Sequence, residues 1–177
     1  MTISLCIKGR EEMIENIIIK PSVQKRFDSF IAHGRVLFFS APCGFGKTAV
    51  AEALLSSREV LRLSADSAGF KLPSTEADWQ ILLLDDLQDM QEEQDWNALC
   101  ELIRACPERR FVLLSRGTPP GSLMAFQYTG LMTVLEADDL LFDADDVRRL
   151  FQLSGANVTD SEIDGILKES VGYPLGV

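Results

Sequence analysis

Eight consecutive residues restrict the fold of this chain more than any other segment. Residues 41–48 read APCGFGKT, in which Gly44 and Gly46 precede Lys47 and Thr48. Glycines let backbone N–H groups turn inward around an anion, and a helix that starts at the lysine directs its positive end at the same point. An apolar run precedes the segment and a helix-forming run follows it. A phosphate-binding loop needs this context of strand, loop and helix.

The polar side chains of this loop have expected roles. Lys47 is expected to reach the β- and γ-phosphates of a nucleotide, and the Thr48 hydroxyl to bind Mg²⁺. The residues expected to contact the nucleotide are Pro42, Cys43, Gly44, Phe45, Gly46, Lys47, Thr48 and Ala49. The alternative is a glycine-rich turn that matches by chance, and the surrounding strand and helix patterns argue against it.

Strand and helix patterns alternate along the chain. Runs of apolar and β-branched residues predict strands, and helical spacing of apolar residues predicts helices between them. The expected strands are 36–39, 60–63, 80–84, 111–114 and 132–135, and the expected helices of this part are 48–57 and 95–105. The central strands are apolar throughout, which is typical of strands buried on both faces. The sequence therefore predicts an α/β fold with helices on both sides of a parallel sheet.

Helices are also expected before and after this core. Ser22 can cap a helix that runs to residue 32, and Gly34 can end it. Later helices are expected at 143–153 and 161–170, the second with a capping box of Thr159 and Glu162. The expected division is an N-terminal segment at 1–34, a core at 35–137 and the start of a helical domain at 138–177. The acidic run 138–146 is expected to be mostly a solvated helix start.

Charged residues follow two of the expected strands. Asp85 and Asp86 come directly after an apolar strand, at the edge of the sheet where the phosphate loop also lies. Asp85 is expected to hold Mg²⁺ through water, and Asp86 to polarise an attacking water. Arg116 follows the strand at 111–114 and is expected to point at the γ-phosphate. The alternatives are an ordinary acidic turn and a solvated arginine.

Composition limits the partners of the chain. It has 17 Lys and Arg against 27 Asp and Glu, a net charge of −10, which repels a phosphate backbone. We therefore expect DNA contacts only through a region absent from this chain. No run of 18 apolar residues exists to span a membrane, and residues 1–10 do not read as a secretion signal. A cytoplasmic protein with reduced thiols at Cys6, Cys43, Cys100 and Cys106 is expected.

Several motifs together resemble a known group of proteins. APCGFGKT, ILLLDD at 81–86, FVLLSRGTPP at 111–120 and GYPLG at 172–176 occur in the order seen in signal-transduction ATPases with numerous domains, the STAND class. Residues 141–146 are similar to the last six positions of an L-x-F-x-x-x-E element of the MalT-like large LuxR-family transcriptional regulators, with Asp146 in place of Glu. The resemblance covers about residues 20–177.

The resemblance implies a fold and an activity. The implied core is a three-layer P-loop NTPase with a five-stranded sheet of order 5-1-4-3-2, followed by a small helical lid. Residues 23–26 would border the base, and Pro174 would close over the adenine. Such proteins bind ATP or ADP with Mg²⁺, hydrolyse ATP slowly and self-associate in the ATP state. Their sensor and DNA-binding domains would follow, and the chain reads as if cut inside a longer protein.

The chain also departs from this group. Relatives carry an additional helix in the span from 57 to 79, and this chain is too short there to contain it. A less complete edge of the sheet is therefore expected. Residues 9–11, GRE, resemble the start of other relatives but lie far ahead of the first strand. The alternatives to a nucleotide switch are a small-molecule kinase with Arg148 and Arg149 in its lid, an AAA+ ATPase, and a nucleotide-bound scaffold without turnover.

Overall fold

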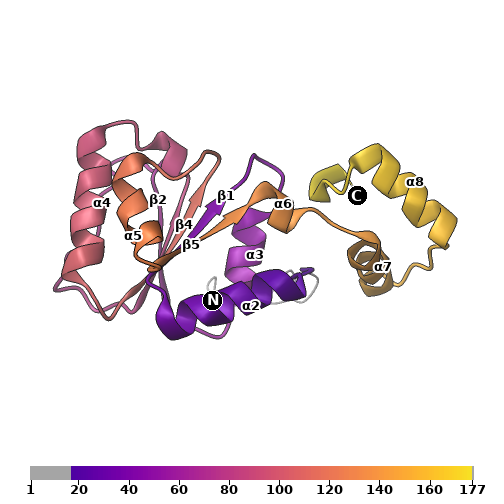
Figure 1. Ribbon diagram of the computed structural model, residues 1–177, viewed down its shortest axis with the longest axis horizontal. Coiled ribbons are helices and arrows are strands. Elements are labelled where there is room, and N and C mark those ends of the chain that lie inside the picture. Colours follow the sequence, from indigo (N-terminus) through magenta and orange to yellow (C-terminus); the bar gives the residue numbers. More distant parts are fainter. Residues whose placement is uncertain (1–16, 177) are drawn as a thin grey trace, which may run out of the picture.

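Five parallel strands form the centre of the protein in the computed structural model, which describes residues 17–176 (Figure 1). The strands are β1 (Val36–Ser40), β2 (Val60–Ser64), β3 (Ile81–Asp85), β4 (Arg110–Ser115) and β5 (Met132–Glu136). Their order is β2-β3-β4-β1-β5, and every neighbouring pair is parallel. Read from the other edge, this order is 5-1-4-3-2. The predicted α/β fold and its strand order are therefore confirmed.

Helices cover both faces of the sheet. The helices and helical turns of the core are α2 (Pro21–His33), α3 (Lys47–Leu54), η1 (Leu87–Asp89), α4 (Glu93–Ala105), η2 (Gly121–Leu123), α5 (Met124–Tyr128) and α6 (Ala137–Leu140). One buried cluster joins Phe38 and Leu113 of the sheet to Ile103 of α4. The other joins Leu37 to Phe27 of α2 and to α3. Alternate side chains of each central strand thus enter opposite cores, which explains why these strands are apolar throughout.

The start of α2 differs from the prediction. The helix begins at Pro21 with Lys20 as its N-cap, and no side chain caps it, so the predicted Ser22 cap is wrong. Proline suits the first helical position because its φ is already helical and its missing N–H would have no partner there. Gly34 ends the helix as predicted, with an extended backbone. A Cβ at Gly34 would lie 3.0 Å from Phe30 Cα, so a larger residue there would crowd the end of the helix.

The edge of the sheet at β2 is complete without an additional helix. All five residues of β2 pair with β3. Between β2 and β3 the structure has turns and no helix, in agreement with the short span in the sequence. Phe70 and Leu72 of this segment pack against the core on the α4 side. The loop therefore covers part of the face that a helix would otherwise cover.

The last two helices stand apart from the sheet (Figure 1). They are α7 (Ala144–Leu153) and α8 (Asp160–Ser170), followed by the helical turn η3 (Pro174–Gly176). The predicted capping box of Thr159 and Glu162 is confirmed at the start of α8. The acidic run is not wholly solvated, because Asp146 is only 3% exposed.

Cys43, Cys100 and Cys106 are free, whereas Cys6 and the GRE motif at 9–11 lie outside the described residues. Within residues 17–176, no helix has the length and apolar character needed to cross a membrane.

Candidate functional site

A polar cavity of about 320 Å³ opens at the carboxyl ends of β1, β3 and β4. Its lining residues are Cys43, Gly44, Gly46, Lys47, Thr48, Ala49, Asp85, Asp86, Gln88 and Arg116. The structure thus brings together all five charged or metal-binding side chains singled out in the sequence. They meet because the carboxyl ends of parallel strands share one edge of the sheet.

The phosphate loop joins β1 to α3 and holds Lys47 in place. Gly44 and Gly46 have φ values of 84° and 74°, a conformation that strains any other residue. Lys47 Nζ donates hydrogen bonds to Ala41 O at 2.7 Å and Pro42 O at 2.9 Å. Burial lowers the pKa of Lys47, and the charge of Asp85 opposes this effect. A buried ammonium at the mouth of a polar cavity is a strong donor for an anion.

Thr48 and Asp85 form an oxygen pair at the same edge. The Thr48 hydroxyl donates to Asp85 Oδ2 at 2.8 Å. The other carboxylate oxygen, Oδ1, accepts from Asp86 N at 2.7 Å. Hydroxyl and carboxylate oxygens are the ligands that Mg²⁺ prefers, so the donor set fits this ion.

Asp86 is held by side chains from two other elements. Its φ is 56°, in the left-handed region. Its carboxylate accepts hydrogen bonds from Ser64 Oγ at 3.1 Å and Gln88 Nε2 at 2.9 Å. Arg116 lies 3.7 Å from Asp86 Oδ1, and its backbone N–H donates to Gln88 Oε1 at 3.3 Å.

Sequence reasoning missed two of these residues. Ser64 is the last residue of β2, so its position at a strand end was a usable signal. Gln88 lies in the short helical turn after β3, where nothing in the sequence marks it.

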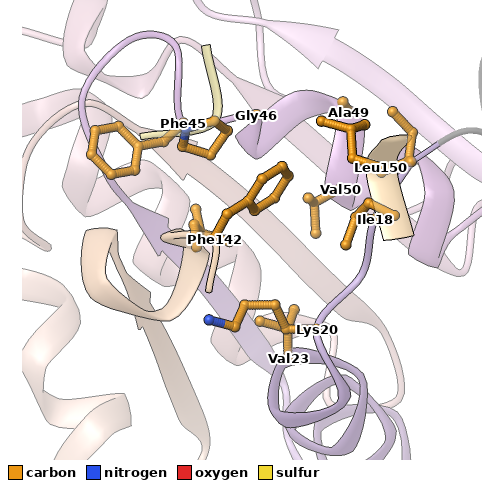
Figure 2. A pocket seen from close by; sticks show the side chains of 12 residues that line it. Ile18, Lys20, Val23, Phe45, Gly46, Ala49, Val50, Phe142 and Leu150 are labelled. Carbon is orange, nitrogen blue, oxygen red and sulfur yellow. The ribbon is translucent and has the colours of Figure 1, made fainter. Parts of the chain in front are cut away.

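A second, apolar cavity of about 180 Å³ lies beside the phosphate loop (Figure 2). Its lining residues are Ile17, Ile18, Lys20, Val23, Phe45, Gly46, Ala49, Val50, Leu140, Phe142, Leu150 and Pro174. Figure 2 shows the Phe142 side chain between Phe45 on one side and Ile18 and Leu150 on the other.

Of residues 23–26, which are expected to border the base, only Val23 lines this cavity. Pro174, the residue expected to close over the adenine, also lines it. Arg26 is not among the lining residues and instead forms an ion pair of 2.7 Å with Asp139. Ile18, Phe142 and Leu150 were not predicted to line the cavity. Phe142 belongs to the quoted stretch 141–146, but nothing in that stretch indicated a contact with the cavity, and the three residues are far apart in the sequence.

Lys20 links the start of α2 to the segment between α6 and α7. Its Nζ donates to Leu141 O at 2.6 Å. The same ammonium lies 3.5 Å from the buried carboxylate of Asp146 and 3.7 Å from that of Asp143. These contacts fasten α7 to the core beside the apolar cavity.

Tyr173 links the end of the chain to the phosphate loop. Its hydroxyl donates to Cys43 O at 2.9 Å. Its ring lies against the ring of Phe45, with centroids 5.1 Å apart. Tyr173 belongs to the predicted GYP turn, but its contact with the loop was not predicted.

Several solved structures have a similar fold. No family model and no curated protein sequence matches the chain. The RuvB Holliday junction branch migration motor of Thermotoga maritima aligns over 90% of this chain and 59% of its own, with 17% identity and a TM-score of 0.58. The replication initiator DnaA bound to AMPPCP and single-stranded DNA aligns over 88% and 59%, with 16% identity and a TM-score of 0.58.

A STAND protein is also similar. The STAND protein of Pyrococcus horikoshii with a tetratricopeptide repeat sensor aligns over 89% of this chain and 28% of its own length, with 11% identity and a TM-score of 0.57. The chain thus spans less than two thirds of the length of each of these three structures. The similarity establishes the fold: the protein has the α/β core of P-loop ATPases.

Proposed function

We propose that this protein is the nucleotide-switch domain of a signal-responsive transcriptional regulator, which binds ATP or ADP with Mg²⁺ and hydrolyses ATP slowly. One observation carries the proposal. Lys47, Thr48, Asp85, Asp86 and Arg116 surround a single polar cavity, which lies beside an apolar one. A nucleotide likewise has a charged phosphate chain and, across the ribose, a flat base whose faces are apolar.

The polar cavity suits the phosphates. In the proposal, the loop N–H groups and Lys47 bind the β- and γ-phosphates. The Thr48 hydroxyl and the Asp85 carboxylate would hold Mg²⁺, Asp85 through water. The bound ion would neutralise charge on the phosphates.

The apolar cavity suits the base. Its lining residues are apolar except Lys20. The Lys20 ammonium already has protein partners, Leu141 O and the Asp146 carboxylate. Val23 and Pro174 both line the cavity and would contact the base, which agrees with the role that the STAND resemblance gives to these segments.

Asp86 and Arg116 would act on the γ-phosphate. Asp86 would polarise the attacking water and Arg116 would contact the phosphate. Both carboxylate oxygens of Asp86 already accept hydrogen bonds, from Ser64 and Gln88. This restraint, together with a side chain shorter than glutamate, favours slow turnover, which a switch needs to keep its ATP state.

The regulatory part of the proposal rests on the resemblance. We divide the chain at 1–34, 35–137 and 138–177 into a segment that borders the base, an ATPase core and the start of a lid. Self-association in the ATP state, a cytoplasmic location and DNA contacts through a region outside this chain complete the proposal. The STAND protein of similar fold has a tetratricopeptide repeat sensor, and this chain aligns with 28% of its length.

Calorimetry with ATP and Mg²⁺ tests the site. Lys47→Ala removes the buried ammonium and is expected to abolish binding while the circular dichroism spectrum stays unchanged. Lys71→Ala, which removes an exposed lysine that lines neither cavity, is the matched control and is expected to bind normally. Binding by Lys47→Ala with wild-type affinity would show that the loop assignment is wrong.

An AAA+ ATPase is the second candidate, because RuvB and DnaA share the fold. Light scattering with ATP separates the two proposals. Rings whose activity depends on an arginine supplied by the neighbouring subunit would favour the AAA+ assignment. The kinase alternative has less support, because Arg148 is engaged by Asp145 and Asp160 at 2.6 and 2.7 Å.

A further inference from the structure

The contact between Tyr173 and the phosphate loop supports one further inference, which rests on the proposed nucleotide site. The tyrosine and the Cys43 carbonyl that accepts its hydrogen bond are 130 residues apart in the sequence. The ring of Phe45 packs against the tyrosine ring and therefore steadies it from the loop side. The end of the described chain thus contacts the backbone of the loop itself.

The turn before Tyr173 fixes where its side chain can lie. Gly172 has a φ of 76°, and a Cβ there would lie 2.5 Å from Phe142 O. Phe142 N donates to Gly172 O at 2.8 Å, and Tyr173 N donates to Ser170 O at 2.9 Å. Backbone hydrogen bonds therefore tie the turn at Gly172 and Tyr173 to α8 and to Phe142, in the segment between α6 and α7.

The hydrogen bond to Cys43 O sets the direction of one peptide group in the loop. Every described peptide bond is trans, so the carbonyl of Cys43 and the N–H of Gly44 point in opposite directions. Because the carbonyl faces Tyr173, the N–H faces away from it. Gly44 lines the polar cavity and Tyr173 does not. Glycine has a wide choice of backbone angles, and Gly44 has a φ of 84°. A contact from outside the loop therefore restricts the orientation of this peptide group.

We propose that Tyr173 is a positioning residue for the nucleotide phosphates. Its hydroxyl holds the peptide between Cys43 and Gly44 so that the loop N–H groups already face the cavity before a nucleotide binds. This arrangement lowers the cost of ordering the loop on binding. The role differs from that of Pro174, which lines the apolar cavity and would act on the base.

The variant Tyr173→Phe tests the role because it removes the hydroxyl and keeps the ring against Phe45. We expect its affinity for ATP and ADP to fall about three- to tenfold, the value of one hydrogen bond, and its affinity for adenosine to stay within about twofold. We also expect faster amide hydrogen exchange at residues 43–46 of the nucleotide-free protein. The matched control is Tyr128→Phe, since Tyr128 is the other tyrosine of the chain and is 81% exposed.

The outcomes separate this inference from the proposed function. If wild type binds ATP and ADP and Tyr173→Phe binds both equally well, the positioning role is wrong and the proposed function stands. An equal loss of adenosine affinity also overturns the role, because the hydroxyl would then act on closure over the base. If wild type binds no nucleotide, the proposed function falls and the positioning role falls with it.

Discussion

The hydroxyl of Thr48 donates a 2.8 Å hydrogen bond to Asp85, although 37 residues separate the two in the sequence. Thr48 is the second residue of α3 and Asp85 is the last residue of β3. The bond therefore joins the phosphate loop to the neighbouring acidic strand end at the cavity. Both side chains supply oxygens of the kind that Mg²⁺ binds, and this pairing underlies the first prediction.

Thr48→Val keeps the shape of the side chain and removes the hydroxyl. We expect ATP affinity in the presence of Mg²⁺ to fall by at least about tenfold, whereas affinity measured in EDTA changes little. Calorimetry with and without Mg²⁺ measures the difference. Thr75→Val alters an exposed threonine away from the cavity and serves as control. A variant that keeps the full Mg²⁺ effect would contradict the assignment of Thr48.

Asp86→Asn keeps the size of the side chain and removes its negative charge. We expect phosphate release from ATP to fall about a hundredfold or more, with ATP affinity within about threefold of wild type, because the base acts on water rather than on the nucleotide. A coupled phosphate-release assay and calorimetry measure the two quantities. Asp164→Asn, on the exposed side of α8, is the matched control. Unchanged release would support a bound-nucleotide scaffold, in which Asp86 has no catalytic role.

Lys20→Met keeps the apolar stem of the side chain and removes the ammonium. The carboxylate of Asp146 is 4% exposed and lies 3.5 Å from this ammonium. We expect the free energy of unfolding to fall by about 2 kcal/mol, because the variant leaves a buried carboxylate without its nearby cation. Urea denaturation measures the loss, and Lys25→Met on the same helix should cost less than about 0.5 kcal/mol.

A double variant tests the coupling between the same two residues. Asp146→Asn removes the charge that Lys20→Met would leave unpaired. The combination of Lys20→Met and Asp146→Asn should therefore lose less stability than the sum of the two single changes. Additive losses would show that the ion pair does not fasten α7 to the core.

Two glycines near the end of the chain should respond to alanine with opposite signs. At Gly172 the φ of 76° strains alanine, and the new Cβ would lie 2.5 Å from Phe142 O, so Gly172→Ala should cost about 2 kcal/mol or more. At Gly165, inside α8, a Cβ meets nothing within 4 Å. Gly165→Ala should therefore stabilise the helix by about 0.5–1 kcal/mol. Urea denaturation of both variants measures the sign, and destabilisation by Gly165→Ala would contradict this geometry.

Asp143 at the start of α7 should make stability fall in acid. Its carboxylate accepts from the N–H groups of Asp146 and Asp145, both at 3.0 Å. The hydrogen bond from Asp146 is the main cause that lowers the pKa of Asp143, the Lys20 charge lowers it further, and burial opposes both. Because the folded pKa is lower than the unfolded one, the cap contributes its full stability above about pH 4 and loses it as pH falls through the folded pKa.

Urea denaturation between pH 7 and pH 2 checks this dependence. Asp143→Asn keeps an acceptor oxygen and removes the charge, so its stability should fall less steeply in acid. Asp143→Ala removes the cap and should cost about 1 kcal/mol at neutral pH. If the stability of Asp143→Asn falls with pH as steeply as that of wild type, this carboxylate does not cause the loss of stability in acid.

The sequence by itself determined the local structure and the chemical identity of the site. The apolar runs located all five strands, and the APCGFGKT segment located the turn in which Gly44 and Gly46 have positive φ. These features depend on residues that are close in the chain, so spacing and backbone preference reveal them. The prediction that Ser22 caps α2 was also a local one and was wrong, because Pro21 was the stronger signal for the start of the helix.

The tertiary structure alone decided several contacts between distant residues. The contacts of Ser64 and Gln88 with Asp86, of Lys20 with Asp146, and of Tyr173 with Cys43 all join separate elements. No local pattern encodes such contacts, because they depend on how helices and strands pack against one another. The sequence thus supplied the groups that we propose bind a nucleotide, and the packing of the sheet and the final helices placed them around one pair of cavities.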